Sequence, residues 1–283
     1  MNHETTIERS EAALQQRSRS IIALTALTAI SAAITIAAGY LGSRTTVYIF
    51  KPATMIFIII IGVIALMTGP GANVGYRNLI IAGLCCSLVG DGLLMLPSDQ
   101  FVPGLISFLI AHLLYIAAFR SRPSGLMSAW YGAACVVYGS LMFWILSPGL
   151  GAMKLPVVVY LIVILTMAWQ ALNRWGATRQ AGAALAAIGA MLFVVSDSAI
   201  AINRFRVGFR LADLLILATY FAAQWLIAMS IASGADSSLR LVTPLRGQSP
   251  DTDKVCATRN LAVRPTTAKA TATNPSISRR RQQ

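Results

Sequence analysis

Long apolar runs alternate with short polar connections along most of the chain. A membrane-spanning helix needs about 20 mostly apolar residues. Segments of that kind occupy residues 21–41, 47–66, 79–97, 104–119, 127–146, 154–173, 182–201 and 212–232. The connections between them are short and contain Gly, Pro or Arg, which leaves no room for a soluble domain. The pattern predicts an all-α membrane protein with eight transmembrane helices.

The two ends of the chain differ from this apolar middle. We expect a polar N-terminal segment at 1–20, the eight-helix transmembrane domain at 21–232 and a disordered basic tail at 233–283. Only 12% of the residues are charged, against about 25% in a soluble domain. Much of the net charge of +13 lies in the tail, which favours contact with anionic membrane lipids. No folded basic domain with interleaved aromatic residues is present, which argues against nucleic acid as a partner.

Counting spans gives the sidedness of the polar residues. An even number of spans places both termini on one side, and the positive-inside rule together with the basic tail favours the cytoplasm for that side. Odd spans end and even spans begin at the opposite face. The residues near that face are Lys51, Asp91, Asp197, Asn203, Arg204 and Asp213. His112 lies about 12 Å below it, and Gln224 lies deeper. We therefore expect a polar cavity that opens toward one leaflet.

Two aspartates, Asp91 and Asp197, stand inside apolar spans with matching surroundings. Each has a Gly eight positions before it and a small residue on either side. An intramembrane carboxylate costs roughly 2.5–3.5 kcal/mol on insertion scales, so two of them need an explanation. The spans FKPATMIFIII (50–60) and MKLPVVVYLIV (153–163) also match, with Lys and Pro at the head of each. We infer a four-plus-four parallel repeat that brings the two aspartates together.

Five motifs in order carry a family resemblance. They are KPATM (51–55), GD (90–91) followed by LLMLP (93–97), FLIAHLLYIAAF (108–119), SDSAIAINRF (196–205) and TYFAAQWLI (219–227). Together they resemble the YhhN-like lysoplasmalogenase family over roughly residues 21–232. Asp91 and Asp197 match the two acidic positions of the family motif. The other residues within motif blocks are Lys51, His112, Tyr115, Asn203 and Tyr220.

The resemblance implies a multi-pass hydrolase of the bacterial plasma membrane that needs no cofactor. Its substrate would be a lysophospholipid with one chain joined by a vinyl ether, a lysoplasmalogen. The products would be a fatty aldehyde and glycerophosphoethanolamine or glycerophosphocholine. Membrane lipids are then the expected surroundings of both substrate and enzyme.

This chemistry suits two carboxylates. Protonation of a vinyl ether at its β-carbon gives an oxocarbenium ion, water adds, and the hemiacetal collapses. Glycosidases divide similar work between an acid and a base. Two close carboxylates in low dielectric do not both ionise easily, so Asp91 and Asp197 offer both roles. Lys51 and Arg204 are candidates for binding phosphate, and His112 for orienting an aspartate.

Simpler explanations exist for each residue. An intramembrane aspartate can pair with Lys51 or a backbone group, and Lys51 can snorkel to the interface. His112 can be a packing residue, and Asp213 can serve the dipole of its helix. Ser196 lacks the G-x-S-x-G turn of a nucleophilic serine.

Other functions also fit parts of the pattern. A transporter or proton-coupled channel could use the Asp pair as a relay, but the polar residues gather at one face. A three-His zinc site is excluded because the chain has only His3 and His112. An intramembrane aspartyl protease needs YD and GxGD motifs, of which GDG (90–92) is a partial match.

Overall fold

The computed structural model describes residues 2–68, 74–121 and 128–242. These residues form α1 (Asn2–Tyr40), α2 (Arg44–Thr68), α3 (Val74–Met95), α4 (Phe101–Arg120), α5 (Ala129–Leu146), α6 (Lys154–Thr178), α7 (Ala181–Phe205) and α8 (Ala212–Val242). Two short 3₁₀ turns, η1 (Ser147–Gly149) and η2 (Gly151–Met153), join α5 to α6. Each of the eight α-helices is long and apolar enough to cross a membrane. The eight predicted spans are therefore confirmed, and the protein is a multi-pass membrane protein.

Helix continues across two of the predicted boundaries, and the predicted division of the chain stays a prediction. Helix α1 begins at Asn2, so the polar N-terminal segment at 1–20 extends the first span as helix. Its Glu, Gln, Arg and Ala residues are good helix formers, which explains the continuation. Helix α8 ends at Val242, ten residues past the predicted tail boundary at 233. The rest of the predicted tail, 243–283, lies outside the described residues.

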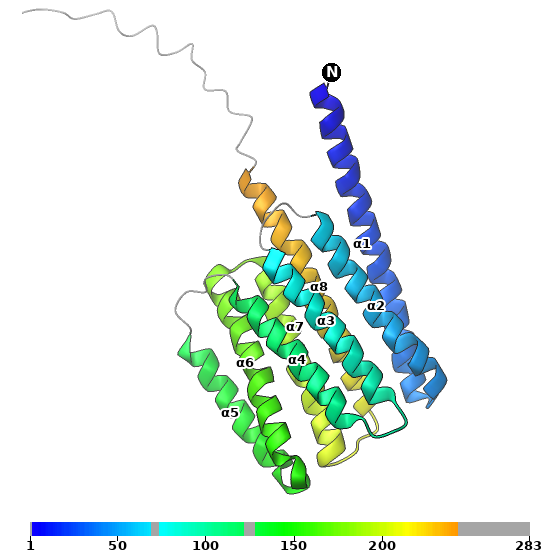
Figure 1. The fold of residues 1–283 in the computed structure, drawn as a ribbon, viewed down its shortest axis with the longest axis vertical. Helices are drawn as coiled ribbons and strands as arrows, with labels where there is room; N and C mark the ends of the chain where they lie inside the picture. Colours follow the sequence, from blue (N-terminus) through cyan, green and yellow to red (C-terminus); the bar gives the residue numbers. More distant parts are fainter. Residues whose placement is uncertain (1, 69–73, 122–127, 243–283) are drawn as a thin grey trace, which may run out of the picture. The chain divides into compact units, whose positions relative to one another are not determined.

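The helices pack mainly as sequential antiparallel pairs, with α1 on α2, α3 on α4 and α7 on α8. Helix α2 also contacts α3 and α8, and α6 contacts α7 and α4 in the corresponding way (Figure 1). This is the neighbour relation that a two-fold axis between the halves would produce. The packing is consistent with the predicted repeat, which stays a prediction.

The Gly eight residues before each aspartate allows two helices to pack closely. A Cβ added at Gly83 would overlap the ring of Tyr115 on α4. A Cβ added at Gly189 would lie 2.9 Å from the carbonyl oxygen of Ala223 on α8. Small residues at these positions therefore allow α3 to approach α4 and α7 to approach α8. Each aspartate follows two turns after such a close contact, which fixes its position.

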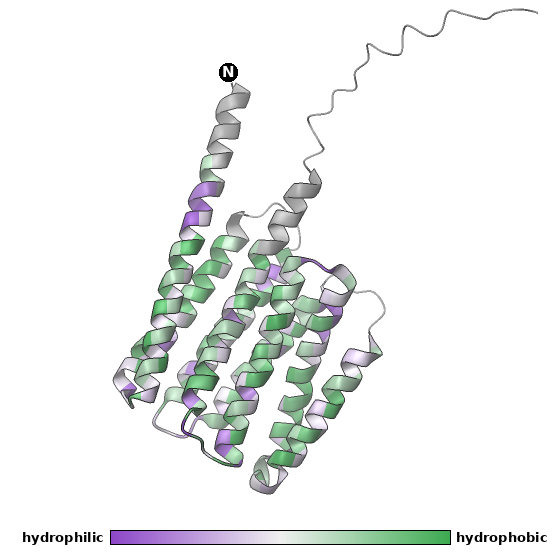
Figure 2. Ribbon diagram, turned by 180° about the vertical axis from the view of Figure 1, so that it is seen from behind, coloured by the Kyte–Doolittle hydropathy of each residue, from purple (hydrophilic) through white to green (hydrophobic). Residues whose placement is uncertain are grey.

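The helix directions place the polar residues as span counting predicted. Helices α3 and α7 end at the end of the bundle where α2, α4 and α8 begin (Figure 1). The helices are hydrophobic over most of their length, with hydrophilic residues mainly toward the ends and at a few internal positions (Figure 2). Lys51, Asp91, Asp197 and Asp213 therefore share one end, called the site end below.

Candidate active site

Asp91 lies near the end of α3 and is almost fully buried, with 1% of its surface exposed. Lys51 of α2 places its Nζ 2.8 Å from Oδ1 of Asp91. The hydroxyl of Tyr220 on α8 donates to Oδ2 at 2.5 Å. Both carboxylate oxygens therefore have a partner, and one of these partners is a cation. Charge-assisted contacts of this kind are shorter and stronger than neutral ones.

A buried polar network continues from Asp91 into the bundle. Gln224 follows Tyr220 by one turn on α8, so the two side chains share a helix face. Tyr115 of α4 donates to Oε1 of Gln224 at 2.9 Å. Tyr115 and Gln224 are both fully buried. The network thus links α2, α3, α8 and α4 around Asp91 and holds this carboxylate firmly in place.

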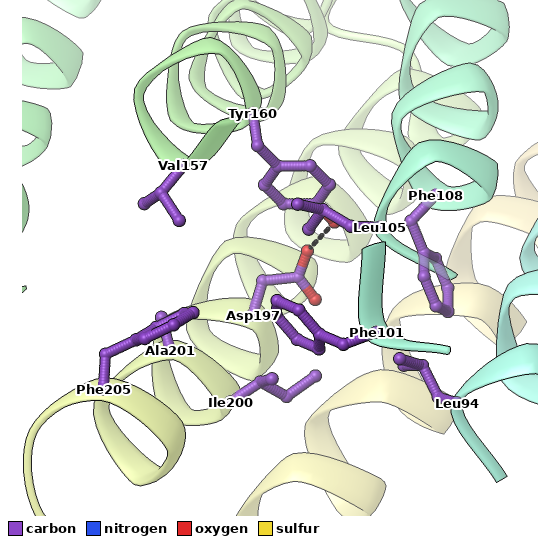
Figure 3. Close-up of a pocket in the computed structure, with 10 residues that line it drawn as sticks. All are labelled: Leu94, Phe101, Leu105, Phe108, Val157, Tyr160, Asp197, Ile200, Ala201 and Phe205. Atoms are coloured by element: carbon purple, nitrogen blue, oxygen red, sulfur yellow. Dashed lines mark hydrogen bonds between the residues drawn. The ribbon is translucent and has the colours of Figure 1, made fainter. Parts of the chain in front are cut away.

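Asp197 of α7 has different surroundings. Its Oδ2 accepts a hydrogen bond from the hydroxyl of Tyr160 on α6 (Figure 3). Within residues 2–68, 74–121 and 128–242, no cation pairs with Asp197. Asp197 and Tyr160 line a cavity of about 60 Å³. The remaining lining residues are apolar: Leu94, Phe101, Leu105, Phe108, Val157, Ile200, Ala201 and Phe205.

An aromatic cluster connects the surroundings of the two carboxylates. The ring of Phe193, one turn before Asp197, is 5.6 Å from the ring of Tyr220, which binds Asp91. Phe108 contacts both Phe193 and Tyr220 edge to face and lines the Asp197 cavity. Tyr220, the partner of Asp91, and Phe108, which lines the Asp197 cavity, thus belong to one cluster.

His112 joins this cluster from α4. Its ring centroid is 4.7 Å from that of Phe193 and 5.3 Å from that of Tyr160. The side chain is fully buried, and neither ring nitrogen has a hydrogen-bond partner among the described residues. A buried imidazole usually bonds to protein or ordered water, so this position suits a residue that holds water or substrate.

The predicted polar cavity corresponds to an outer groove of about 580 Å³ at the site end. Lys51 stands on its wall, above Asp91. Its other charged residues are Arg44, in the first turn of α2, and Asp213, in the first turn of α8. Leu94 and Ile200 line both this groove and the Asp197 cavity. The two spaces are therefore neighbours with a common apolar wall.

Two predicted binding residues have other partners. Asn203 accepts a hydrogen bond from the backbone N–H of Phe209 at 3.3 Å, which closes the α7–α8 turn. Arg204 pairs with Asp99 at 2.9 Å and lies 4.0 Å from the ring centroid of Phe101. Neither side chain has a recorded contact with Asp91 or Asp197, so their roles in binding stay predictions.

Tyr160 is the site residue that the sequence did not reveal. It stands in MKLPVVVYLIV, six residues after Lys154, inside a segment used only to infer the repeat. A tyrosine hydroxyl in an apolar span needs a partner, and that signal could have singled it out. Arg44 and Tyr48, which line the outer groove, were also missed. Among the described residues, no group of three His, Cys, Asp or Glu side chains can hold a metal ion.

The chain is similar to proteins of one membrane family. The family model described as the YhhN family matches residues 46–231. Lysoplasmalogenase TMEM86A of Bos taurus is 38% identical over 181 residues, 62% of this chain and 72% of that protein. Lysoplasmalogenase TMEM86B of Sus scrofa is 34% identical, over 61% of this chain and 72% of its own length.

A bacterial relative covers more of the chain. The membrane protein YhhN of Escherichia coli O157:H7 is 30% identical over 203 residues, 71% of this chain and 95% of that protein. No solved structure matches the chain. The family match covers more than half of the sequence, from α2 to α8, and includes every helix of the candidate site. The chain belongs to the YhhN family.

Proposed function

We propose that this protein is a membrane-embedded lysoplasmalogenase. It hydrolyses the vinyl ether of a lysoplasmalogen to a fatty aldehyde and glycerophosphoethanolamine or glycerophosphocholine. Relatives at 34–39% identity carry the name lysoplasmalogenase. The observation that carries the proposal is a pair of intramembrane aspartates, each bonded to a tyrosine, with surroundings connected by one aromatic cluster.

Asp197 acts as the general acid. It has one tyrosine partner and no cation among the described residues, and it lines a cavity that is otherwise apolar apart from Tyr160. An apolar setting without a cation favours the neutral carboxylic acid over the carboxylate. The cavity of about 60 Å³ has room for a small reacting group beside Asp197, since a water occupies about 30 Å³ in the liquid.

Asp91 acts as the base and supplies the negative charge. Its contact with Lys51 at 2.8 Å favours a carboxylate, and Tyr220 orients it. The oxocarbenium ion forms beside aromatic faces of Phe108 and Phe193, which also stabilise positive charge. His112 positions the attacking water through its unpartnered ring nitrogens.

The proposed reaction begins and ends with Asp197 protonated and Asp91 ionised. Asp197 gives its proton to the β-carbon, the C=C π bond becomes a C–H bond, and an oxocarbenium ion results. Water adds to the cationic carbon while Asp91 takes one of its protons. Asp197 then removes the hydroxyl proton of the hemiacetal as Asp91 returns its proton to the glycerol oxygen. The C–O bond breaks, aldehyde and alcohol leave, and both carboxyl groups return to their starting states.

The location of the site fits a lipid substrate. The outer groove and both aspartates lie at the site end, opposite the end where α1 begins (Figure 1). With both termini in the cytoplasm, as the basic residues favour, the substrate enters from the outer leaflet. The cavity is too small for a whole alkenyl chain, so the rest of the chain extends beyond it.

The alternative of a proton-coupled transporter needs a polar path to the other end of the bundle. The network from Lys51 continues as far as Tyr115. Beyond Tyr115, the apolar ring of Phe119 contacts both the ring of Tyr115 at 6.4 Å and the ring of Tyr76 at 6.5 Å. This break in the described polar residues favours a one-sided site over a relay across the membrane.

The test compares three substrates with the purified full-length protein in detergent micelles. One carries a vinyl ether chain, one an ester chain and one an alkyl ether chain, all with the same head group. We expect aldehyde release from the vinyl ether alone, because only a C=C bond next to the ether oxygen accepts the proton. Equal cleavage of the ester, or no aldehyde from the vinyl ether, would contradict the proposed function.

A further inference from the structure

The outer groove has a chemical character that the proposed reaction does not use. Its volume of about 580 Å³ far exceeds that of the Asp197 cavity, and its lining includes charged and hydroxyl side chains. The first turn of α2 forms one side, with Ser43, Arg44 and Tyr48, and the first turn of α8 forms another, with Asp213. Vinyl ether hydrolysis needs none of these groups.

The groove offers one unpaired charge of each sign. Arg44 and Asp213 are both exposed, and neither has an ion-pair partner among the described residues. Lys51, the third charged residue of the groove, already pairs with Asp91. Charges that form no pair with each other across an open groove complement a ligand that carries both signs. A free anion or a free amine would satisfy only one of them.

The α2 side of the groove suits an anion. Gly42 adopts a positive φ of 74°, which allows the tight turn from α1 into α2. The free N–H groups of the first helical turn and the positive end of the helix dipole favour a phosphate there. Arg44 adds a guanidinium that can bind two phosphate oxygens at once.

The groove is next to the reacting centre. Leu94 and Ile200 line both spaces, so a lipid can lie with its head group in the groove and its ether linkage beside Asp197. Gly104 of α4 makes room for Leu94 in this wall, because a Cβ there would lie 2.7 Å from a Leu94 methyl carbon.

We propose that the outer groove is the head-group subsite, with Arg44 and the α2 N-terminus binding phosphate and Asp213 binding the amine of a zwitterionic head group. The inference rests on the proposed function for the identity of the lipid. It makes Asp213 the residue that distinguishes ethanolamine or choline lipids from anionic ones.

The experiment measures head-group selectivity with the full-length protein. Vinyl ether lysolipids with a phosphoethanolamine head group and with a bare phosphate are compared by kcat/KM. The Asp213→Asn variant should lose about tenfold of the preference for the zwitterionic lipid, equivalent to about 1.4 kcal/mol. The loss should appear in KM with kcat unchanged, as expected for binding shared by ground and transition states. Asp213→Glu should retain most of the preference.

Asp99→Asn is the matched control, since Asp99 is an exposed carboxylate at the same end that does not line the groove. An unchanged preference in Asp213→Asn would overturn the head-group subsite while leaving the hydrolase intact. Binding of the corresponding alkyl ether lipids, which are not cleaved, gives a second readout. If the wild type cleaves no vinyl ether, the proposed function fails. The test of the subsite is then the ratio of the binding constants for the phosphoethanolamine and bare-phosphate alkyl ether lipids. If Asp213→Asn leaves this ratio unchanged, the head-group subsite is overturned.

Discussion

The two aspartates occupy similar places, near the ends of α3 and α7, but have unlike surroundings. Asp91 is closed off by a cation, a tyrosine and a buried network that extends to Tyr115. Asp197 has one tyrosine and faces a small, mostly apolar cavity. In the proposed mechanism, Asp91 is thus held in place as a carboxylate base, and Asp197 carries the proton that is donated.

In the proposed mechanism, this difference gives two similarly placed aspartates two chemical roles. Helices α3 and α7 each carry a Gly eight residues before the aspartate. The roles then differ through the residues on neighbouring helices. Lys51 faces Asp91, whereas Lys154, its match in the second half, is exposed at the start of α6. The proposed role of Asp197 as the acid rests on this difference, since no cation among the described residues pairs with it.

The largest expected effect on stability comes from Lys51→Met. The change leaves the buried Asp91 without its cation, and breaking a buried pair in this way costs about 3–5 kcal/mol. The corresponding change at Lys154, to Met, should cost well under 1 kcal/mol because Lys154 is exposed. Unfolding of both variants in detergent checks the contrast. The double variant Lys51→Met with Asp91→Asn should recover part of the loss; no recovery would mean that the pair does not carry the effect.

Removing the hydroxyl of Tyr160 and that of Tyr220 should have different effects on activity and stability. Tyr160→Phe removes the only described partner of Asp197 and should lower kcat about 10- to 100-fold with little loss of stability. Tyr220→Phe removes one of two partners of Asp91 and should cost about 1.5–3 kcal/mol of stability, as for a hydrogen bond to a charged group. Steady-state kinetics and thermal unfolding of the same preparations give both quantities. If Tyr160→Phe and Tyr220→Phe changed kcat equally and stability equally, the different roles of Asp197 and Asp91 would be contradicted.

The role of His112 predicts a smaller change. His112→Phe keeps an aromatic ring between Phe193 and Tyr160 but removes both ring nitrogens. We expect kcat to fall about tenfold with KM unchanged, because only the position of the attacking water is lost. Stability should stay the same or rise, since no recorded hydrogen bond among the described residues is broken. A normal kcat would show that His112 is a packing residue.

The smallest effect is expected at the surface of the site end. Asp99→Asn breaks the exposed pair with Arg204, and such pairs contribute about 0–1 kcal/mol. Activity and unfolding should both stay close to those of the wild type. A large loss of activity with normal stability would support the prediction that Arg204 binds substrate.

Much of the fold follows from the sequence because the membrane restricts the choices. Apolar runs of the right length predict the spans, and counting them places Lys51, Asp91 and Asp197 at one end. The pairing of Lys51 with Asp91 follows from two opposite charges in neighbouring spans. These predictions need only the hydropathy of each segment and the odd or even number of each span, and both can be read from the sequence.

The surroundings of Asp197 could not be predicted in the same way. Which helix contacts α7 at Asp197 depends on tertiary packing. The hydrogen bond from Tyr160 to Asp197 could therefore not be predicted from the apolar segment around Tyr160. The helical continuation of the N-terminal segment was missed because polarity was given more weight than helix propensity. Asn203 and Arg204 have the right depth, but turn geometry and Asp99 determine their contacts.

The central claim is that Asp197 is the acid, and its direct test is aldehyde release from a vinyl ether lysolipid by Asp197→Asn. The asparagine keeps the size of the side chain and an oxygen for Tyr160, so the fold should be retained. Loss of a general acid lowers rates about 10²- to 10⁴-fold. We predict a drop of at least about 100-fold with unfolding unchanged and with Asp99→Asn fully active. Aldehyde release by Asp197→Asn at the wild-type rate would contradict the account.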